Sequence, residues 1–534
     1  MIQRFIIASA LALLSVLFFA CSQKTVEPVK ESPYNEVIYH VFQRSFYDSN
    51  GDSHGDLKGL QQKLDYLQEL GVNSILLLPL YESVYYHNYY TGDFEKIDST
   101  FGSMKDYLSL VKEIHQRGMK IYMDMETQYV TEDHPWYKSA VGDTASPYRD
   151  YILFEDEAHT KPATFVFDLR GWTGYDGVYK KIVTVNLKNK DVLDYNIKLY
   201  SFWVDPNKDG KFDDGVDGFR FDHMMDTLDK KKELQGLFRD FWLPLVSTLQ
   251  RINPAIRNVA EQADWASWGQ EYILDGVADR IFSFKLMGAI RSFDKTQLES
   301  KTDSAFSIFP NNNQTVIFIE NHDLPRFSSQ VNKDPARLKI GAALNLLLGG
   351  TASIYYGQEL GMYGNGAWGK WGMNDGNEIP MREAFEWYTS DTGKGMANWY
   401  KDTGIWWDST NLKPNDGISL EEQRGDSQSV FNFYKKMIRI RKQNPVVATG
   451  IYSIVANDNE NVFSFKRADE NDALIVAANL SGKPAVANLQ DSLFNEKVFK
   501  STRLNGNAVM KQNGNGLQMQ LPPYAVEIWQ MTRK

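Results

Sequence analysis

The stretch Ser74–Pro79 reads Ser-Ile-Leu-Leu-Leu-Pro, and it decides the fold class of this chain. Its successive apolar residues predict a buried strand. Leucines recur at helical spacing through residues 57–70 before it, and Gly71 ends that predicted helix. A second helix is expected over residues 104–117, followed by the strand Lys-Ile-Tyr-Met-Asp-Met at 120–125. This alternation of strands and helices predicts an α/β fold with a parallel sheet.

The same alternation extends along most of the chain and supplies eight strand candidates. They are residues 37–42, 74–79, 120–125, 215–221, 257–260, 278–284, 315–319 and 352–356. Further helices are expected over residues 191–203, 230–250, 335–348 and 429–442. Eight strands interspersed with helices favour a (β/α)8 TIM barrel.

Two regions depart from this alternation. Residues 131–185 are polar and aromatic and too long for an ordinary loop, which predicts a subdomain inserted after the third strand. From about residue 446 the chain changes to short alternating strands with Asn, Asp and Gly turns. These strands are expected at residues 462–466, 473–478 and 525–531. We therefore assign residues 34–445 to the barrel with its insert, and residues 446–534 to a C-terminal antiparallel β-sandwich domain.

The N-terminal segment carries the only cysteine, Cys21, which excludes an internal disulfide framework and a cysteine zinc cluster. Residues 5–20 are almost wholly apolar, short for a membrane span and typical of a secretory signal. Ala20 before the cysteine resembles a bacterial lipoprotein cleavage site. We expect residues 1–20 to be a signal peptide, Cys21 to be lipidated and residues 21–33 to be a tether. The alternative is an uncleaved signal anchor.

This interpretation predicts an exported protein attached to a bacterial cell membrane through its lipid, facing the periplasm or the cell surface. The composition is that of a globular chain of 534 residues, 43% hydrophobic and 24% charged. Its net charge of −10 argues against a nucleic-acid partner, which would need clustered Lys and Arg. Aromatic residues are plentiful, with 13 Trp, 28 Tyr and 30 Phe, and aromatic faces also stack against sugar rings.

Acidic side chains end several of the predicted barrel strands. They are Asp124, Asp222 with Arg220 nearby, Glu261, and Asp323 beside His322. In a barrel the carboxyl ends of the strands converge on one mouth, so these groups would face one another. Carboxylates brought together repel, and their pKa values separate. Glycoside cleavage requires that arrangement, because one carboxylate attacks the sugar carbon while another donates a proton to the leaving oxygen. A single such acid could instead cap the next helix.

The motifs around these acids make the sequence recognisable. Residues 218–222 (Gly-Phe-Arg-Phe-Asp), 260–265 (Ala-Glu-Gln-Ala-Asp-Trp) and 320–323 (Glu-Asn-His-Asp) lie in this order along the chain. Supporting segments are residues 37–46, 87–94 and 355–359. Over nearly all of the mature chain, the sequence resembles the α-amylase family of glycoside hydrolases.

The resemblance implies a role for each of these side chains. Asp222 would be the nucleophile that forms a covalent glycosyl-enzyme, Glu261 the general acid/base, and Asp323 a third carboxylate that holds the 2- and 3-hydroxyls of the sugar. Arg220 would keep Asp222 ionised and oriented. His322 would bind the same hydroxyls, and Tyr89 would stack under the sugar ring.

The chain departs from the family pattern at sugar-binding positions. Gln128 and Tyr129 stand where Asn and His are usual, and that His contacts the 6-hydroxyl. Tyr90 replaces an Asp, and Met225 and Asp226 stand where Lys and His are common. We therefore predict a retaining α-glycosidase that hydrolyses α-glucosidic bonds in α-glucans or oligosaccharides, with altered subsites that include Tyr129 and Tyr90.

Three other functions remain open at this point. One is a non-catalytic glycan-binding lipoprotein on the same fold, and another is a transglycosylase, because a second sugar competes with water for the same intermediate. The third is a serine esterase, since residues 51–55 match a G-x-S-x-G motif with Ser53 at its centre. Residues 364–369 match G-x-G-x-x-G but no helix follows, so we expect a loop at the barrel mouth that offers Trp368 or Trp371 to a sugar.

A short loop at residues 48–56 has oxygen-bearing side chains at alternate positions, the pattern that a hard cation such as Ca²⁺ needs. The expected structural Ca²⁺ ligands are the side chains of Asp48, Asn50, Asp52 and Asp56 and the backbone carbonyl of His54. A solvated Asx-rich turn is the alternative. Residues 205–213 have a similar spacing but lack the bidentate Glu, because Val216 stands in its place.

Overall fold

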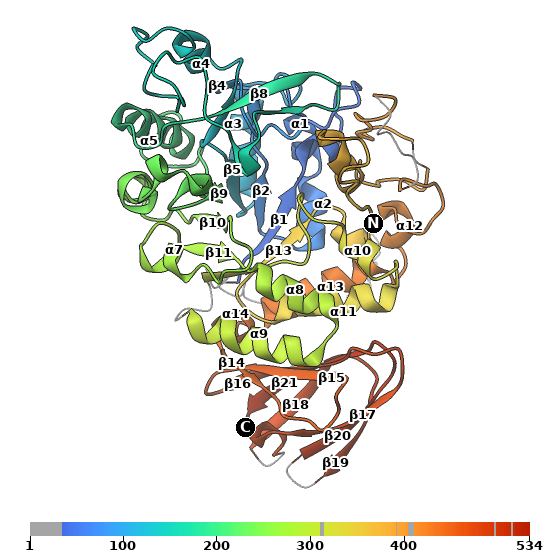
Figure 1. Ribbon diagram of the computed structural model, residues 1–534. Helices are drawn as coiled ribbons and strands as arrows, with labels where there is room; N and C mark the ends of the chain where they lie inside the picture. Colours follow the sequence, from blue (N-terminus) through green and yellow to red (C-terminus); the bar gives the residue numbers. More distant parts are fainter. Residues whose placement is uncertain (1–34, 310–313, 391, 404–410, 496–497, 514–515) are drawn as a thin grey trace, which may run out of the picture. The chain divides into compact units, whose positions relative to one another are not determined.

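The computed structural model describes residues 35–309, 314–390, 392–403, 411–495, 498–513 and 516–534 (Figure 1). The predicted signal peptide, tether and lipidation site at Cys21 lie outside the described residues. Among the residues that are described, no helix has the length and apolar character needed to cross a bilayer.

Eight parallel strands close into a barrel in the order β1-β13-β12-β11-β10-β9-β5-β2, as predicted. Their bounds are β1 (Val37–Val41), β2 (Ser74–Leu77), β5 (Lys120–Met125), β9 (Gly218–Met224), β10 (Val259–Gln262), β11 (Arg280–Phe282), β12 (Thr315–Ile317) and β13 (Thr351–Tyr355). All eight predicted strands are present. The register pairs Asp124 on β5 with Arg220 on β9, and Arg220 with Val259 on β10, so the acidic strand ends are neighbours.

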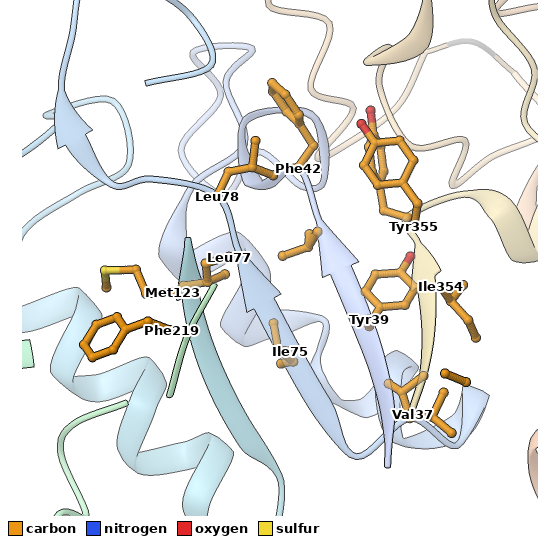
Figure 2. Close-up of a cluster of buried hydrophobic side chains, with 14 of the residues drawn as sticks. Val37, Tyr39, Phe42, Ile75, Leu77, Leu78, Met123, Phe219, Ile354 and Tyr355 are labelled. Atoms are coloured by element: carbon orange, nitrogen blue, oxygen red, sulfur yellow. The ribbon is translucent and has the colours of Figure 1, made fainter. Parts of the chain in front are cut away.

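Successive residues of these strands alternate between two apolar clusters, because side chains of a strand point to opposite faces in turn. Ile38, Leu76 and Tyr122 belong to a cluster with Phe282 and Val316. Their strand neighbours, such as Val37, Tyr39 and Ile75, belong to the larger cluster that includes the leucines of the helices. Figure 2 shows members of this larger cluster on β1, β2 and β13. Strands buried on both faces explain the continuous apolar runs of the sequence.

The helices of the barrel region follow most of the predicted bounds. They are α1 (Leu57–Gln62), α2 (Leu64–Leu70), α3 (Met104–Gln116), α5 (Lys190–Val204), α6 (Leu243–Ile252), α7 (Gln270–Leu274), α8 (Phe284–Ser292), α9 (Lys295–Ile308), α10 (Phe327–Gln330), α11 (Pro335–Leu347), α12 (Leu420–Arg424), α13 (Val430–Gln443) and α14 (Val446–Thr449).

Two predicted helices are wrong in detail. The helix over 57–70 is two helices, because Lys63 between them has non-helical backbone angles. The helix over 230–250 begins late: Asp229 and Lys230 adopt left-handed angles, and Gly236 also has a positive φ. The chain there forms 3-10 turns, then the π-helix η5 (Phe238–Trp242) and α6. Left-handed residues interrupt a helix that the apolar periodicity alone would continue.

The insert after β5 forms a small sheet in the order β6-β8-β7, made of β6 (Tyr129–Thr131), β7 (Gly171–Thr173) and β8 (Tyr179–Thr184), together with α4 (Pro135–Ala140). A shorter pair, β3 (Tyr81–Glu82) and β4 (Asp93–Ile97), precedes it. Thr173 forms a β-bridge with Asn374 in the segment after β13, and Asn374 Nδ2 donates to the Gly174 carbonyl at 3.1 Å. The insert is thereby joined to a segment two hundred residues away.

The C-terminal region holds two antiparallel sheets. The first has the order β14-β15-β16-β21-β18, made of β14 (Ile451–Ile454), β15 (Val462–Ala468), β16 (Asp472–Asn479), β21 (Val526–Arg533) and β18 (Phe499–Asn505). The second has the order β17-β20-β19, made of β17 (Ala485–Gln490), β20 (Gly516–Leu521) and β19 (Val509–Asn513). Arg467 of β15 is fully buried and donates to the Leu348 carbonyl at the end of α11, at 3.3 Å, which ties this region to the barrel.

Candidate active site

Three carboxylates from three neighbouring strands meet one guanidinium at the barrel mouth. Arg220 Nη1 lies 2.9 Å from the Asp124 carboxylate and also forms an ion pair with Asp222. Its Nη2 lies 2.8 Å from Oε2 of Glu261. Arg220 is fully buried, so these charge pairs form away from water, where they are strong and where an unpaired charge would be costly. The structure therefore brings together the predicted nucleophile and the predicted acid/base.

Asp323, in the segment after β12, lies at the same cavity as Asp222 but contacts a different cation. Its Oδ1 lies 3.4 Å from Arg382 Nη2 and 3.2 Å from His322 Nε2. Arg382 is buried and also pairs with Glu378 at 2.6 Å, while its Nε donates to the His322 carbonyl at 2.9 Å. Arg382 and Glu378 were not predicted from the sequence. They lie in and after the turn η8 (Asp375–Met381), which carries none of the strand-end motifs.

Burial dominates the electrostatics of these acids. It raises the pKa of Asp222, and Arg220 opposes that rise without cancelling it. The same two causes act on Glu261, whose pKa is also raised, and burial together with the nearby Glu261 raises the pKa of Asp323. Arg220 therefore favours the ionised form of Asp222, and desolvation acts against it. Acids with raised pKa values can share a proton near neutral pH, which suits a site that needs one nucleophile and one acid.

Tyr89 and His322 form a stacked pair beside the acids. Their ring centroids are 5.4 Å apart with an interplanar angle of 12°. The Tyr89 hydroxyl lies 2.7 Å from Asp124 Oδ2 and 3.0 Å from His322 Nε2. Burial lowers the pKa of His322 well below its usual range, so the imidazole is neutral. A neutral ring suits hydrogen bonding to hydroxyls.

A cavity opens beside Asp222 and Asp323, and its lining divides into two kinds of side chain. Charged and polar groups are His87, Asp222, His322, Asp323, Asp375, Glu378 and Arg382. Aromatic groups are Tyr89, Tyr90, Phe165, Phe167, Trp172 and Trp368, with Val166 as an aliphatic neighbour. Acids and aromatic faces in one concave site are what a sugar needs, since its hydroxyls accept and donate hydrogen bonds while its C–H faces pack on rings. Trp368 lies where the loop at residues 364–369 was expected to offer it.

The sequence departures have separate structural outcomes. Gln128 Nε2 donates to the backbone carbonyl of Asp222 at 2.6 Å and to that of His223 at 3.1 Å. These bonds hold the backbone that carries the nucleophile. Tyr129 is 1% exposed and lies behind Tyr90, with ring centroids 6.1 Å apart. Asp226 accepts the Phe238 N–H at 2.8 Å. Of these side chains, Tyr90 is the one among the cavity-lining residues.

His223, directly after the nucleophile, was not singled out from the sequence. Its backbone N–H donates to Glu261 Oε2 at 3.3 Å, and its Nε2 lies 2.9 Å from Asp229 Oδ1. Its φ of 45° is unusual for a residue with a side chain and marks local strain of the kind found at functional sites. The predicted acid/base, Glu261, therefore accepts a hydrogen bond from a backbone N–H.

The predicted calcium loop is organised by its first acid. Asp48 Oδ1 accepts the N–H groups of Asn50 at 3.0 Å and Gly51 at 2.7 Å, and Oδ2 accepts that of Ser53 at 2.8 Å. Asp56 caps α1. Asp48 Oδ2 accepts one N–H and keeps a second lone pair, so this oxygen-rich set still fits a hard cation. Within the described ranges, no group of three or more His, Cys, Asp and Glu side chains is arranged to hold a metal.

Comparison with known proteins agrees with this geometry. Residues 40–239 and 274–450 match a family described as alpha amylase, catalytic domain, and residues 452–528 match one described as maltogenic amylase, C-terminal domain. Alpha-amylase 3 of Dictyoglomus thermophilum is 28% identical over 460 residues, covering 84% of this chain and 85% of that protein.

Two further relatives cover more of the chain. Oligo-1,6-glucosidase of Parageobacillus thermoglucosidasius is 28% identical over 539 residues, covering 88% of this chain and 93% of that protein. The crystal structure of alpha-amylase from H. orenii superposes with a TM-score of 0.75 and 27% identity, covering 92% of this chain and 99% of that one.

Proposed function

The chain belongs to the α-amylase family of glycoside hydrolases, and we propose that it hydrolyses α-glucosidic bonds in α-glucans or oligosaccharides with retention of configuration. The observation that carries this proposal is the contact of Arg220 with both Asp222 and Glu261. Two carboxylates held by two nitrogens of one guanidinium stay close together. Retaining enzymes need this short separation, whereas inverting enzymes need room for a water between the two acids.

The proposed reaction proceeds in two steps. Asp222 attacks the anomeric carbon while Glu261 gives its proton to the glycosidic oxygen, so that the C–O bond breaks and a glycosyl ester forms on Asp222. Glu261, now ionised, then takes a proton from water, and the water oxygen displaces Asp222 from the anomeric carbon. Two displacements on one carbon restore its α configuration. The stacked Tyr89 and His322 would hold the ring, and Asp323 its hydroxyls.

The charges of the cavity favour a neutral sugar. Four acids line it, Asp222, Asp323, Asp375 and Glu378, against the single cation Arg382. That cation is already paired with Glu378 and Asp323. A phosphorylated or carboxylated sugar would meet several acids there and a cation that is already paired, so it would lose affinity. We therefore propose uncharged α-linked glucose units as the substrate.

The stereochemistry of the first product tests this proposal. The protein is incubated with α-1,4- and α-1,6-linked oligosaccharides, and proton NMR follows which anomer forms before mutarotation. Retention predicts the α anomer first, whereas initial formation of the β anomer contradicts the mechanism. The variants Asp222→Asn and Glu261→Gln should lose activity. Asp264→Asn is the matched control, because Asp264 lies in the same motif as Glu261 and is exposed.

Product analysis distinguishes the alternatives. Chromatography of products at rising substrate concentration reports transglycosylation as oligosaccharides longer than the substrate. Absence of any cleavage, together with sugar binding measured by calorimetry, would favour the glycan-binding alternative. The Ser53→Ala variant tests the esterase alternative, since loss of ester hydrolysis would support it.

We also propose that the loop of residues 48–56 binds a structural Ca²⁺ through Asp48, Asn50, Asp52, Asp56 and the His54 carbonyl. Alternating oxygen donors and two buried carboxylates, those of Asp48 and Asp56, support this. Binding to the folded state alone would raise the melting temperature with Ca²⁺ concentration. Asp48→Asn should abolish that rise. An unchanged melting temperature of the wild-type protein in EDTA and in millimolar Ca²⁺ would contradict the site.

We further propose that the protein is an exported lipoprotein anchored to a bacterial membrane through Cys21. The apolar run before Cys21 and the small residue Ala20 support this. Expression in a bacterial host with a labelled fatty acid should label the wild-type protein and not Cys21→Ala. An unlabelled wild-type protein in the soluble fraction would contradict the anchor.

A further inference from the structure

We propose that the contact between the side chains of His223 and Asp229 holds a bulge in β9 and thereby positions Glu261, the proposed acid/base, for proton donation to the leaving oxygen. His223 and Asp229 act through Glu261, so both are positioning residues. This inference rests on the proposed glycosidase function and deepens it. It predicts that the pair matters most for leaving groups that need a proton.

The bulge lies where β9 and β10 carry the two reacting acids. Between two regular pairs of the ladder, β9 contributes Asp222 and His223, whereas β10 contributes Glu261 alone. Bulges are common next to active sites, where they re-aim a group of the bulged strand. The group re-aimed here is the His223 N–H, which donates to Glu261 Oε2 at 3.3 Å. The flanking regular pairs are Phe221 with Ala260 and Met224 with Gln262.

Glu261 receives two donors on the same oxygen. Arg220 Nη2 lies 2.8 Å from Oε2, and the His223 N–H is the second donor. A single contact would let the carboxyl group rotate about it, whereas two contacts fix its plane. Two donors on Oε2 also favour the unprotonated form of that oxygen. The proton to be transferred is therefore carried by Oε1, and the His223 N–H helps to fix where Oε1 points.

His223 adopts a backbone conformation that is unfavourable for a residue with a side chain. Its φ is 45°, in the left-handed region. Its ring supplies a restraint, because Nε2 lies 2.9 Å from Asp229 Oδ1. Asp229 lies in η3 (Leu228–Lys230) and is itself left-handed, with φ of 44°, a conformation that Asp tolerates better than most residues. Two left-handed residues six positions apart thus restrain each other.

The charge states suit a hydrogen bond from the ring to the carboxylate. Burial, together with Arg220 and Lys231, lowers the pKa of His223 to about 4, so the imidazole is neutral at pH 7. Burial raises the pKa of Asp229 to about 6 against the effect of Lys231, so the carboxylate is ionised at pH 7. A neutral ring donates only from its protonated nitrogen, and the contact with Oδ1 assigns that proton to Nε2. The pair is therefore a directional hydrogen bond.

The test compares two substrates that differ in how much their leaving group needs a proton. Fluoride leaves α-glucosyl fluoride with little help from an acid, whereas the sugar that leaves maltotriose or isomaltotriose needs Glu261. The trisaccharide used is the one that the wild type cleaves faster. We expect Asp229→Ala and His223→Ala each to lower kcat/KM on the trisaccharide by about tenfold or more, and on the fluoride by less than about threefold. A merely structural defect would lower both values equally.

Conservative variants give a second measurement on the same two substrates. Asp229→Asn keeps an oxygen that accepts the Nε2–H and should retain more trisaccharide activity than Asp229→Ala. His223→Gly loses the ring but adopts the left-handed angle without strain, so it should lose less activity than His223→Ala. The variant that combines His223→Ala with Asp229→Ala should lose no more than either alone, because both remove one contact. Glu233→Gln is the matched control, since Glu233 is exposed in η4 (Lys232–Leu234) of the same segment.

The outcomes separate this inference from the proposed function. Losses confined to the trisaccharide support the positioning role. Equal losses on both substrates, additive losses in the double variant, or wild-type values in both Ala variants refute it while the function stands. If the wild type cleaves neither substrate, the proposed function fails and the inference falls with it. If the melting temperature shows that an Ala variant does not fold, Asp229→Asn and His223→Gly carry the same comparison of substrates.

Discussion

Arg220 Nη2 lies 2.8 Å from Oε2 of Glu261 while Nη1 of the same side chain pairs with Asp222, so one cation contacts both partners of the proposed reaction. Arg220 lowers the pKa of both acids against the rise that burial causes. It therefore sets the proton distribution of the pair as well as its geometry. A guanidinium suits this task because its nitrogens lie in a fixed plane and remain charged at all relevant pH values.

Replacing that cation should shift the pH dependence as well as the rate. Lysine in Arg220→Lys offers a single ammonium that cannot contact three carboxylates in one plane. We expect kcat to fall by about 10²–10³-fold. With its counter-charge weakened, the pKa of Asp222 rises further, so the nucleophile ionises at higher pH and the acid limb of the kcat profile moves to higher pH. Rate profiles from pH 4 to 9 measure both effects. A lower rate with an unmoved acid limb would contradict the electrostatic role.

The Gln128 side chain should position the nucleophile Asp222 by holding the backbone carbonyl of Asp222. Its Nε2 bonds to the Asp222 and His223 carbonyls are lost in Gln128→Leu, which keeps much of the side-chain volume. Small displacements of a reacting group cost up to about 10²-fold in rate. We expect kcat to fall by about tenfold or more with a smaller change in KM. Gln128→Asn, which keeps the amide, should recover part of the loss. Equal kcat values for the Leu variant and the wild type, at equal melting temperatures, would exclude this role.

The buried Glu359 should make stability depend on pH. It accepts hydrogen bonds from Tyr39 at 2.7 Å and Tyr66 at 2.5 Å, yet burial raises its pKa to about 7. Because this pKa lies above the unfolded value of 4.5, the unfolded state loses its proton at lower pH than the folded state does. Raising the pH therefore favours unfolding. The free energy of unfolding should therefore fall between about pH 4.5 and pH 7, by up to about 3 kcal/mol.

Glu359→Gln removes the titration and serves as the comparison for that measurement. Urea unfolding of both proteins at pH 5 and pH 8 should show a smaller pH difference in the variant. An identical pH difference in the two proteins would assign the effect to other groups.

Arg467 should contribute to the free energy of unfolding through its packing more than through its charge. It is fully buried, lies over the Phe306 ring at 4.8 Å, and burial lowers its pKa to about 9. Arg467→Ala should lower the free energy of unfolding by about 2–4 kcal/mol through lost packing. Arg467→Met keeps most of the volume without a buried charge and should cost less. Denaturant titrations monitored by circular dichroism measure the order of the two variants. A Met variant less stable than the Ala variant would contradict the packing argument.

The barrel could be predicted from local patterns because each strand is a short apolar run that ends in a polar residue. Asp222, Glu261 and Asp323 could be placed for the same reason, since parallel strands bring their carboxyl ends to one edge. Phe167, Trp172 and Asp375 could not. They reach the cavity through the Thr173–Asn374 bridge, which no periodicity encodes.

Tyr129 shows a second reason why the site could not be predicted fully from the sequence. The motif position placed it against the sugar, but the side chain is buried behind Tyr90, which lines the cavity. A motif fixes where the backbone runs, while neighbouring side chains decide which of them reaches the ligand. The helix predicted over 230–250 begins late for a different reason, because Lys230 and Gly236 adopt positive φ angles that the apolar periodicity does not encode.

The position of β21 has a consequence for how the chain is made. β21 contains residues 526–533, and it lies at the interior of the five-stranded sheet between β16 and β18. During synthesis that sheet stays incomplete until residues 526–533 leave the ribosome, and until then β16 and β18 expose unpaired edges that invite aggregation. A stop codon or a protease cut before β21 would therefore do more harm than the loss of a surface loop of the same length.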